Sequence, residues 1–307
     1  MKKIAFLFPG QGAQYVGMGK DFYDAFAIAR ETFQEADDLL GEKLSKIIFE
    51  GPQELLTETR YSQVAIFVTS MAIFRTIQQQ LDGWTPSVCA GLSLGEYTAL
   101  CASGRLSFAE TLMLVKERAR LMNEACERIP GTMAAVLGLD AAGIEAAVKG
   151  LNGVWVANYN APGQTVISGT KEGIERAAQA LKEKGAKRVL PLTVHGAFHS
   201  GLMQSAQEGL KGAIERAPII DSQIELVMNV PGAFVKSVAE IRANLIRQVT
   251  QSVRWEQGIA ALKASGVDFY LEVGCGKTLT GLNKKMDISS MSAIDKVADL
   301  EVAHAIA

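Results

Sequence analysis

The chain has 307 residues, of which 48% are hydrophobic and 21% charged, as in a soluble globular protein with one large or two unequal domains. Its formal net charge of −2 gives no global attraction to nucleic acid or to an anionic membrane, so neither is expected as a partner. The cysteines lie far apart without a Cys-x-x-Cys pair, which predicts neither a metal site nor a disulfide framework. No apolar run approaches the ~18 residues of a membrane span. We therefore expect a cytoplasmic protein.

The first predicted element is a strand at residues 3–8, which leads into the glycine-rich turn Pro9-Gly10-Gln11-Gly12. A dinucleotide-binding fingerprint would need a third glycine where the chain has Tyr15, so that function is excluded. The free backbone N–H groups of such a turn still suit an oxyanion. Residues 21–80 are predicted to be mostly helical, with a strongly apolar segment at 64–77.

The stretch Gly91-Leu92-Ser93-Leu94-Gly95 has the G-x-S-x-G spacing of a nucleophile elbow. A short strand is predicted at 86–90 and a helix at 94–102, so the serine lies on the strand-to-helix turn that an elbow requires. The alternative is an ordinary turn serine. We favour Ser93 as a nucleophile.

A second helix begins at Ser107, where Ser107 and Glu110 match a capping box, and continues to about Glu127. One face of this helix is apolar, and Arg118 lies beside that face. Taken alone, an arginine in such a place is most often a snorkelling or salt-bridged side chain.

The pattern then changes to short elements that read β-α-β-β-α-β, the order of a ferredoxin-like domain. Strands are predicted at 132–139, 153–159, 164–169 and 187–194, and helices at 141–149 and 171–184. Beyond them the alternation resumes, with strands at 224–230 and 267–273 and helices from Ser237 and from about Trp255.

The predicted fold class is therefore α/β: a large α/β-hydrolase-like domain with a mainly parallel sheet (residues 1–128 and 197–307), interrupted by a smaller ferredoxin-like domain (129–196). The cleft between the two domains is the expected substrate site.

An elbow serine needs a general base, and the histidines of the chain are His195, His199 and His304. His304 lies in a tail that reads as peripheral. His195 and His199 both lie where the chain returns from the insert to the large domain, and their chemistry does not choose between them.

Five stretches, taken in chain order, match one known family: Phe8-Pro9-Gly10-Gln11-Gly12, Gly91-Leu92-Ser93-Leu94-Gly95-Glu96-Tyr97, Asn158-Tyr159-Asn160-Ala161-Pro162-Gly163-Gln164, Gly196-Ala197-Phe198-His199-Ser200 and Glu272-Val273-Gly274. Together they resemble the malonyl-CoA:acyl carrier protein transacylase family. The resemblance extends over nearly the whole chain.

The resemblance implies that Ser93 is the nucleophile and His199 its base. It implies that a main-chain carbonyl, that of Gln248, orients the histidine in place of a carboxylate. The backbone N–H groups of Gln11 and Leu94 would then form the oxyanion hole.

Arg118 matches the family arginine that binds the free carboxylate of the malonyl group, a role that suits its planar fork of donors. Gln63, Met122 and Asn160 match positions that line the family's pocket. Phe198 resembles malonyl-selective members and would crowd an α-methyl branch.

The implied reaction is ping-pong transfer of a malonyl group from malonyl-CoA to the phosphopantetheine thiol of holo acyl carrier protein, for fatty acid biosynthesis. The CoA thioester is a substrate, no cofactor is bound permanently, and a monomer is expected. The alternatives are a serine thioesterase or esterase, a trans-acting acyltransferase of polyketide synthesis, and a silent docking module.

The chain departs from the family pattern at three places. Many members have histidine where this chain has Leu92, and His195 stands where a small residue is usual. Gln251-Ser252 replaces a common Asn-Pro pair after the orienting glutamine.

Overall fold

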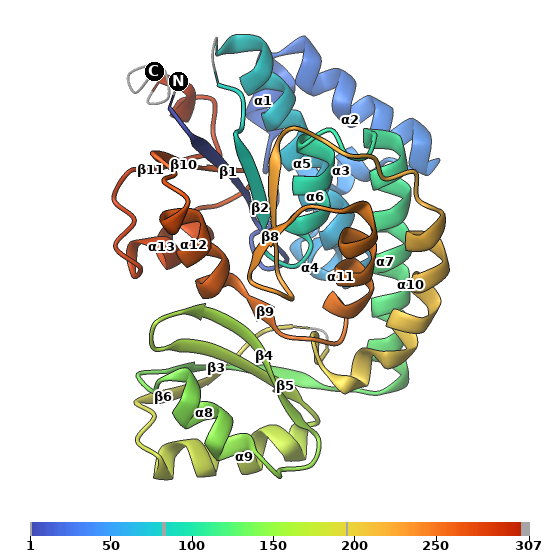
Figure 1. Ribbon diagram of the computed structural model, residues 1–307. Helices are drawn as coiled ribbons and strands as arrows, with labels where there is room; N and C mark the ends of the chain where they lie inside the picture. Colours follow the sequence, from blue (N-terminus) through green and yellow to red (C-terminus); the bar gives the residue numbers. More distant parts are fainter. Residues whose placement is uncertain (1, 82–83, 195, 302–307) are drawn as a thin grey trace.

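The computed structural model describes residues 2–81, 84–194 and 196–301. It contains a six-stranded and a five-stranded sheet with helices packed on both, so the chain is a mixed α/β protein. Figure 1 shows the smaller sheet and its two helices as a separate layer below the larger part. In the described part of the chain, no helix is long and apolar enough to cross a membrane.

The large sheet has the order β11-β10-β1-β2-β7-β8 and is parallel except for the antiparallel edge strand β8. Its strands are β1 (Ile4–Phe8), β2 (Val88–Gly91), β7 (Glu225–Met228), β8 (Ala233–Val235), β10 (Phe269–Val273) and β11 (Met291–Ile294). The four strands expected from buried apolar runs are confirmed, whereas β8 and β11 were not predicted. The mainly parallel sheet is also confirmed.

Both faces of this sheet are covered, because its strands alternate between two apolar clusters. In β1, Phe6 and Phe8 face one cluster, and Ala5 and Leu7 face the other. The first cluster is built with α1 (Lys20–Ala25), α2 (Ala27–Leu40), α3 (Leu44–Glu50), α4 (Gln53–Thr57), α5 (Thr59–Gln80), α6 (Gly95–Ala102), α7 (Phe108–Arg128), α10 (Gln204–Arg216) and α11 (Val238–Gln248). The second is built with α12 (Trp255–Ala264) and α13 (Thr278–Lys284).

Two helices begin at the predicted caps. Ser237 and Glu240 form a complete capping box at α11. At α7 the Ser107 hydroxyl accepts the Glu110 backbone N–H, but the Glu110 carboxylate accepts the Ser107 hydroxyl and not its backbone N–H. The second box is therefore only half formed.

The small sheet has the order β6-β3-β5-β4-β9. Its strands are β3 (Thr132–Leu137), β4 (Val154–Ala161), β5 (Gln164–Gly169), β6 (Arg188–Pro191) and β9 (Val253–Arg254). The first four pair antiparallel, and α8 (Ala141–Val148) and α9 (Lys171–Glu183) cover one face through a separate apolar cluster. The predicted β-α-β-β-α-β order is present. The fifth strand, β9, was not predicted; it comes from beyond the insert and pairs parallel to β4.

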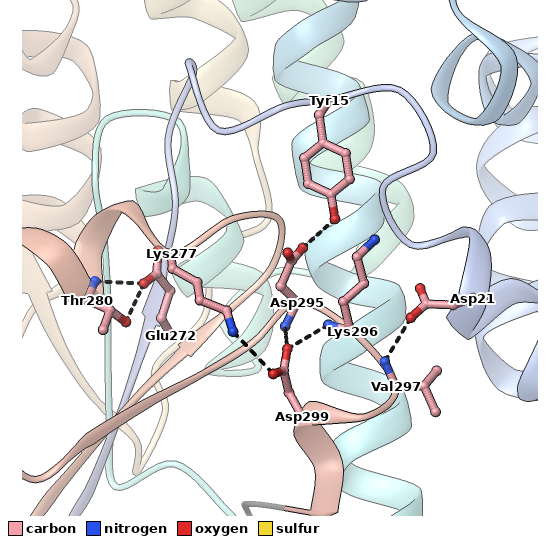
Figure 2. Close-up of polar contacts among 9 residues, drawn as sticks. All are labelled: Tyr15, Asp21, Glu272, Lys277, Thr280, Asp295, Lys296, Val297 and Asp299. Carbon is pink, nitrogen blue, oxygen red and sulfur yellow. Dashed lines mark hydrogen bonds and ion pairs between the residues drawn. The ribbon is translucent and has the colours of Figure 1, made fainter.

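The last described segment is bound to the start of the chain by polar contacts, shown in Figure 2. The Tyr15 hydroxyl donates to Asp295 at 2.7 Å, and the Val297 backbone N–H donates to Asp21 at 2.8 Å. Asp299 accepts two backbone N–H groups of the same turn and pairs with Lys277 at 3.2 Å. These contacts fix the loop after β1 on one side.

Candidate active site

Ser93 lies on a tight turn between the end of β2 and the start of α6, and its φ of 54° is in the left-handed region that side chains rarely adopt. The flanking glycines allow this turn through close backbone approach. A Cβ atom on Gly91 would lie 2.0 Å from the Gly95 backbone, and one on Gly95 would lie 2.1 Å from the Phe8 carbonyl oxygen. The G-x-S-x-G spacing therefore follows from the packing of β1, β2 and α6.

His199 is the histidine that reaches the elbow serine. Its Nε2 lies 2.8 Å from Ser93 Oγ, and its Nδ1 lies 2.7 Å from the main-chain carbonyl oxygen of Gln248. A carbonyl only accepts, so Nδ1 carries the proton and Nε2 is left as an acceptor for the serine hydroxyl. His195 and His304 lie outside the described residues.

Burial, at 3% exposure, and the nearby Arg118 cation lower the pKa of His199 to about 4. The imidazole is therefore neutral at pH 7 and able to accept the Ser93 proton. The hydrogen bond to the Gln248 carbonyl acts in the opposite direction, because it stabilises the imidazolium.

Arg118 lies in the interior beside Ser93, with 1% of its surface exposed. Its Nη2 donates to Ser93 Oγ at 3.1 Å and to the Gln248 side-chain oxygen at 2.9 Å, and its Nη1 donates to Gln63 Oε1 at 2.5 Å. Among the described residues, no ion pair includes Arg118, and its Nε atom has no partner. The interpretation of Arg118 as a snorkelling or salt-bridged side chain is therefore wrong. In the described part of the chain, the hydrogen-bond acceptors of this buried cation are neutral oxygens, and its guanidinium carbon lies 5.3 Å from the centroid of the Tyr97 ring.

Of the four expected pocket residues, Gln63 and Met122 lie beside Arg118, and Phe198 precedes His199 in the chain. Gln63 links Arg118 to Met122, since its Nε2 lies 3.6 Å from the Met122 sulfur. Phe198 is buried in the main apolar cluster next to His199. Asn160, in β4, has a buried side-chain oxygen without a partner in the part of the chain that the structure describes.

Gln11 and Leu94, the expected oxyanion donors, both keep an available backbone N–H: neither donates to any group of the described chain. The loop that carries Gln11 is held against the elbow, because the Leu92 N–H donates to the Phe8 carbonyl at 3.0 Å and a Cβ on Gly10 would lie 2.4 Å from the Leu92 carbonyl oxygen. The Leu92 side chain packs with the apolar cluster on the α12 side of the sheet.

Two polar residues of this centre were missed by the sequence analysis. Asn229 follows β7 and accepts the Ser93 N–H at 2.7 Å, while its own amide donates to the Gly91 carbonyl at 2.7 Å. Glu96 accepts the Asn229 N–H at 2.6 Å and the Gln248 side-chain amide at 2.7 Å. A polar residue directly after a buried parallel strand next to the elbow was a usable signal for Asn229.

A cavity of about 350 Å³ lies between the two sheets, with His199 in its wall. Trp155 and Val156 of β4 form one side, and Val230 and Gln251 belong to the other. This is the expected cleft between the two parts of the chain. Gln63, Met122, Asn160 and Phe198 do not belong to its lining.

In the described ranges, no group of three or more His, Cys, Asp or Glu side chains is arranged to hold a metal ion. All four cysteines are free.

Known proteins match this chain over nearly its whole length. The acyl transferase domain family matches residues 5–285. The malonyl CoA-acyl carrier protein transacylase of Bacillus subtilis (strain 168) is 45% identical over 291 residues, which cover 94% of this chain and 91% of that protein. The chain belongs to this transacylase family. Its members are acyltransferases, and the resemblance stated from the motifs is confirmed.

Two solved structures of the family superpose on nearly the whole chain. The enzyme of Streptococcus pneumoniae is 40% identical with a TM-score of 0.94, covering 99% of this chain and 100% of that one. PlMCAT, solved with the type II polyketide carrier protein AntF, is 39% identical with a TM-score of 0.94 and the same coverage.

The loop after Gln248, where Gln251-Ser252 replaces the common Asn-Pro pair of the family, is held by two hydrogen bonds. The Ser252 hydroxyl donates to the Val156 carbonyl at 2.6 Å, and the Gln251 N–H donates to the Arg247 carbonyl at 2.9 Å. The segment after Gln248 is therefore anchored to β4.

Proposed function

We propose that the protein transfers a malonyl group from malonyl-CoA to the phosphopantetheine thiol of holo acyl carrier protein through an ester on Ser93. The observation that supports this most directly is the buried Arg118 guanidinium 3.1 Å from Ser93 Oγ. A buried cation beside an acylated serine favours an acyl group that ends in a carboxylate.

In the first half-reaction, His199 Nε2 takes the Ser93 proton while Oγ attacks the thioester carbonyl carbon. The Gln11 and Leu94 N–H groups stabilise the negative oxygen of the tetrahedral intermediate. The carbon–sulfur bond then breaks, and the imidazolium returns its proton to the leaving CoA sulfur.

The second half-reaction reverses these roles. His199 takes the proton of the carrier thiol, the thiolate sulfur attacks the ester carbonyl, and Ser93 leaves with the proton from the imidazolium. The cavity between the sheets, with His199 in its wall, is the route we propose for the thioester arm of both substrates.

Arg118 argues against the alternative of a thioesterase or esterase for neutral acyl groups. Such an enzyme gains nothing from a desolvated guanidinium at the nucleophile, and burial of an unpaired cation is costly. A malonyl carboxylate would replace neutral oxygens as its partner and would form the missing charge pair.

We also propose that the chain divides into residues 1–128 and 197–307 as an α/β-hydrolase-like domain and 129–196 as a ferredoxin-like domain. The strand order β6-β3-β5-β4 and the separate apolar cluster below it support the second assignment. Nucleophile, base and guanidinium all come from one chain, which is consistent with a monomer.

Intact-mass analysis after mixing with malonyl-CoA tests the function. We expect a malonyl adduct on the wild type that holo acyl carrier protein discharges, and none on Ser93→Ala. An adduct that water removes as fast as the carrier does would indicate a hydrolase.

A polyketide carrier is the second candidate acceptor, because PlMCAT, which is similar over nearly the whole chain, was solved with the type II polyketide carrier protein AntF. Discharge rates with fatty acid and polyketide carriers, measured at equal concentration, distinguish the two. We expect the fatty acid carrier to be faster.

A further inference from the structure

Glu96 is a fully buried carboxylate at the centre of the active site that the proposed mechanism does not use. It lies in the first turn of α6, three residues after the nucleophile. Both of its oxygens are engaged. Oε1 accepts the Asn229 backbone N–H at 2.6 Å, and Oε2 accepts the Gln248 side-chain amide at 2.7 Å.

Each partner of Glu96 holds a part of the catalytic machinery. Asn229 accepts the Ser93 N–H and so fixes the strained elbow. The Gln248 amide also donates to the Ser93 carbonyl at 2.8 Å, and the main-chain carbonyl of Gln248 orients His199. One carboxylate is thus hydrogen-bonded to both residues that position the nucleophile and its base.

We propose that Glu96, in its ionised form, is a positioning residue for the acyl transfer: its two carboxylate oxygens hold Asn229 and the Gln248 side chain in place. The inference rests on the proposed function of Ser93 and His199. It assigns no direct contact between Glu96 and the substrate.

The ionised form is required because both partners are donors. A carboxylate accepts at both oxygens, whereas a protonated carboxyl or a glutamine presents a hydrogen toward one of the two N–H groups. Two hydrogens would then face each other, and the hydrogen bond of Glu96 to either the Asn229 N–H or the Gln248 side-chain amide would be lost. The orientation of the Gln248 amide is fixed on its other side, where its oxygen accepts from Arg118 at 2.9 Å.

Charge balance supports the same role. Arg118 is the cation that acts on Glu96, and Tyr97 interacts with both. Strands β1 and β2 carry no charged residue. The charged residues of α5 and β7, which also pack on α6, are engaged in ion pairs: Arg60 with Glu58, Arg75 with Glu35, and Glu225 with Lys3. Helix α7 packs on α6 as well and contributes Arg118. Its Arg120 pairs with Glu117 and Glu124, and its Glu110, Lys116 and Glu127 contact Ser107, the Leu40 carbonyl and Asn123.

Glu96 is therefore poised to titrate in a physiological range. Burial is the main cause that raises its pKa to about 7, while the hydrogen bonds from Asn229 and Gln248 and the Arg118 charge oppose the rise. His199, with a pKa lowered to about 4, stays neutral over the same range. A rate change near pH 7 thus separates the two groups.

The test is the pH dependence of kcat/KM for malonyl-CoA, a quantity that reports the free enzyme, between about pH 5.5 and 8.5. The wild type is compared with Glu96→Gln and with Glu272→Gln. Glu272 is a matched control: it is buried, it accepts the Leu279 and Thr280 N–H groups, and its contact with Thr280 is drawn in Figure 2. Thermal unfolding midpoints of all three proteins accompany the rates.

We expect the wild-type value to fall as the pH drops through about 7 and to level off at the value of Glu96→Gln, which itself stays flat. The difference at pH 8.5 should be at least about tenfold, the rate equivalent of one hydrogen bond to a charged group. Glu272→Gln should lower the unfolding midpoint and keep the wild-type pH profile.

A wild-type profile without a step near pH 7, or a step that survives in Glu96→Gln, overturns the inference. The wild-type profile decides the question even where Glu96→Gln does not fold. Failure of the proposed function is seen separately, because the wild type would then form no malonyl adduct on Ser93.

Discussion

The Nη2 atom of Arg118 lies 3.1 Å from Ser93 Oγ, the atom that accepts the acyl group in the proposed reaction. This cation and the nucleophile are brought together by the packing of α7 against α6, although 25 residues separate them. Among the residues that the structure describes, the guanidinium has no anionic partner in direct contact, so an acyl group with a free carboxylate would complete the pair.

Arg118→Ala should lower kcat/KM for malonyl transfer by at least about 30-fold, since removal of one partner of a buried charge pair costs about 2–5 kcal/mol. Acetyl transfer should change far less. Arg120→Ala, on the same helix but paired with Glu117 and Glu124 at the surface, is the matched control and should leave both rates unchanged. Equal losses for both acyl groups in Arg118→Ala would contradict the carboxylate role.

Phe198 should make methylmalonyl-CoA a poor substrate. The ring is buried beside His199, so it has little room to move away from an α-methyl branch. We expect kcat/KM for malonyl-CoA to exceed that for methylmalonyl-CoA by at least about tenfold, the usual discrimination against one extra methyl group in a filled pocket. Phe198→Leu should lower the ratio of the two kcat/KM values. This ratio is unaffected by partial unfolding of the variant, because both substrates are measured on the same folded enzyme. A ratio near one in the wild type contradicts the prediction.

Gly95→Ala should destabilise the elbow severely, because its Cβ would lie 2.1 Å from the Phe8 carbonyl oxygen in the central strand β1. We expect a loss of at least about 3 kcal/mol in the free energy of unfolding, at the upper end of overpacking costs. Gly281→Ala is the control, since its Cβ meets nothing within 4 Å and it lies within α13. That variant should be neutral or gain up to ~1 kcal/mol. Urea unfolding of both variants measures the difference.

His199 should make the folded state less stable in acid. Its pKa is lowered to about 4 in the folded protein, against an ordinary value near 6.5, so between these values the unfolded chain binds the extra proton. This contribution to stability is present above about pH 6.5 and is lost as the pH falls toward 4. Glu96, whose pKa is raised to about 7, acts in the opposite sense, because its contribution is lost as the pH rises.

Comparison with the variant His199→Gln isolates the contribution of His199 to the pH dependence of stability, because Glu96 is present in both proteins. Between pH 7 and pH 5, the unfolding free energy of the wild type should fall by about 2 kcal/mol more than that of His199→Gln. Equal pH dependence in the two proteins would show that His199 is not buried in its neutral form.

The fold was predictable wherever one pattern ran over several residues. The apolar runs of β1, β2, β7 and β10 and the turn at Pro162-Gly163 marked their elements, because burial on both faces and a glycine turn leave local signals. The short edge strands β8, β9 and β11 carry no such pattern. Their pairing is decided by the sheets that they join, which no local window contains.

At the site, the sequence motifs predicted the residues whose side chains react, but not those that hold them. An acidic residue in the first turn of a helix is ordinarily exposed to solvent and interacts favourably with the helix dipole. The sequence therefore did not indicate that Glu96 is buried. The contact of its carboxylate with Gln248, 152 residues away, joins α6 to the last residue of α11, which no local window of the sequence contains. The burial of Arg118 likewise follows from helix packing and not from its place beside an apolar stripe.

The two-residue strand β9 limits how freely the small sheet can be exchanged. It begins five positions after Gln248, whose carbonyl orients His199, and it pairs with β4 of the small sheet. A chimera could take residues 129–196 from a relative and keep the two points where the chain enters and leaves the small sheet. Its new β4 would then have to pair with the original β9, to which it is not matched. The two units are therefore not interchangeable as modules, and successful grafts should need residues 249–254 from the same donor.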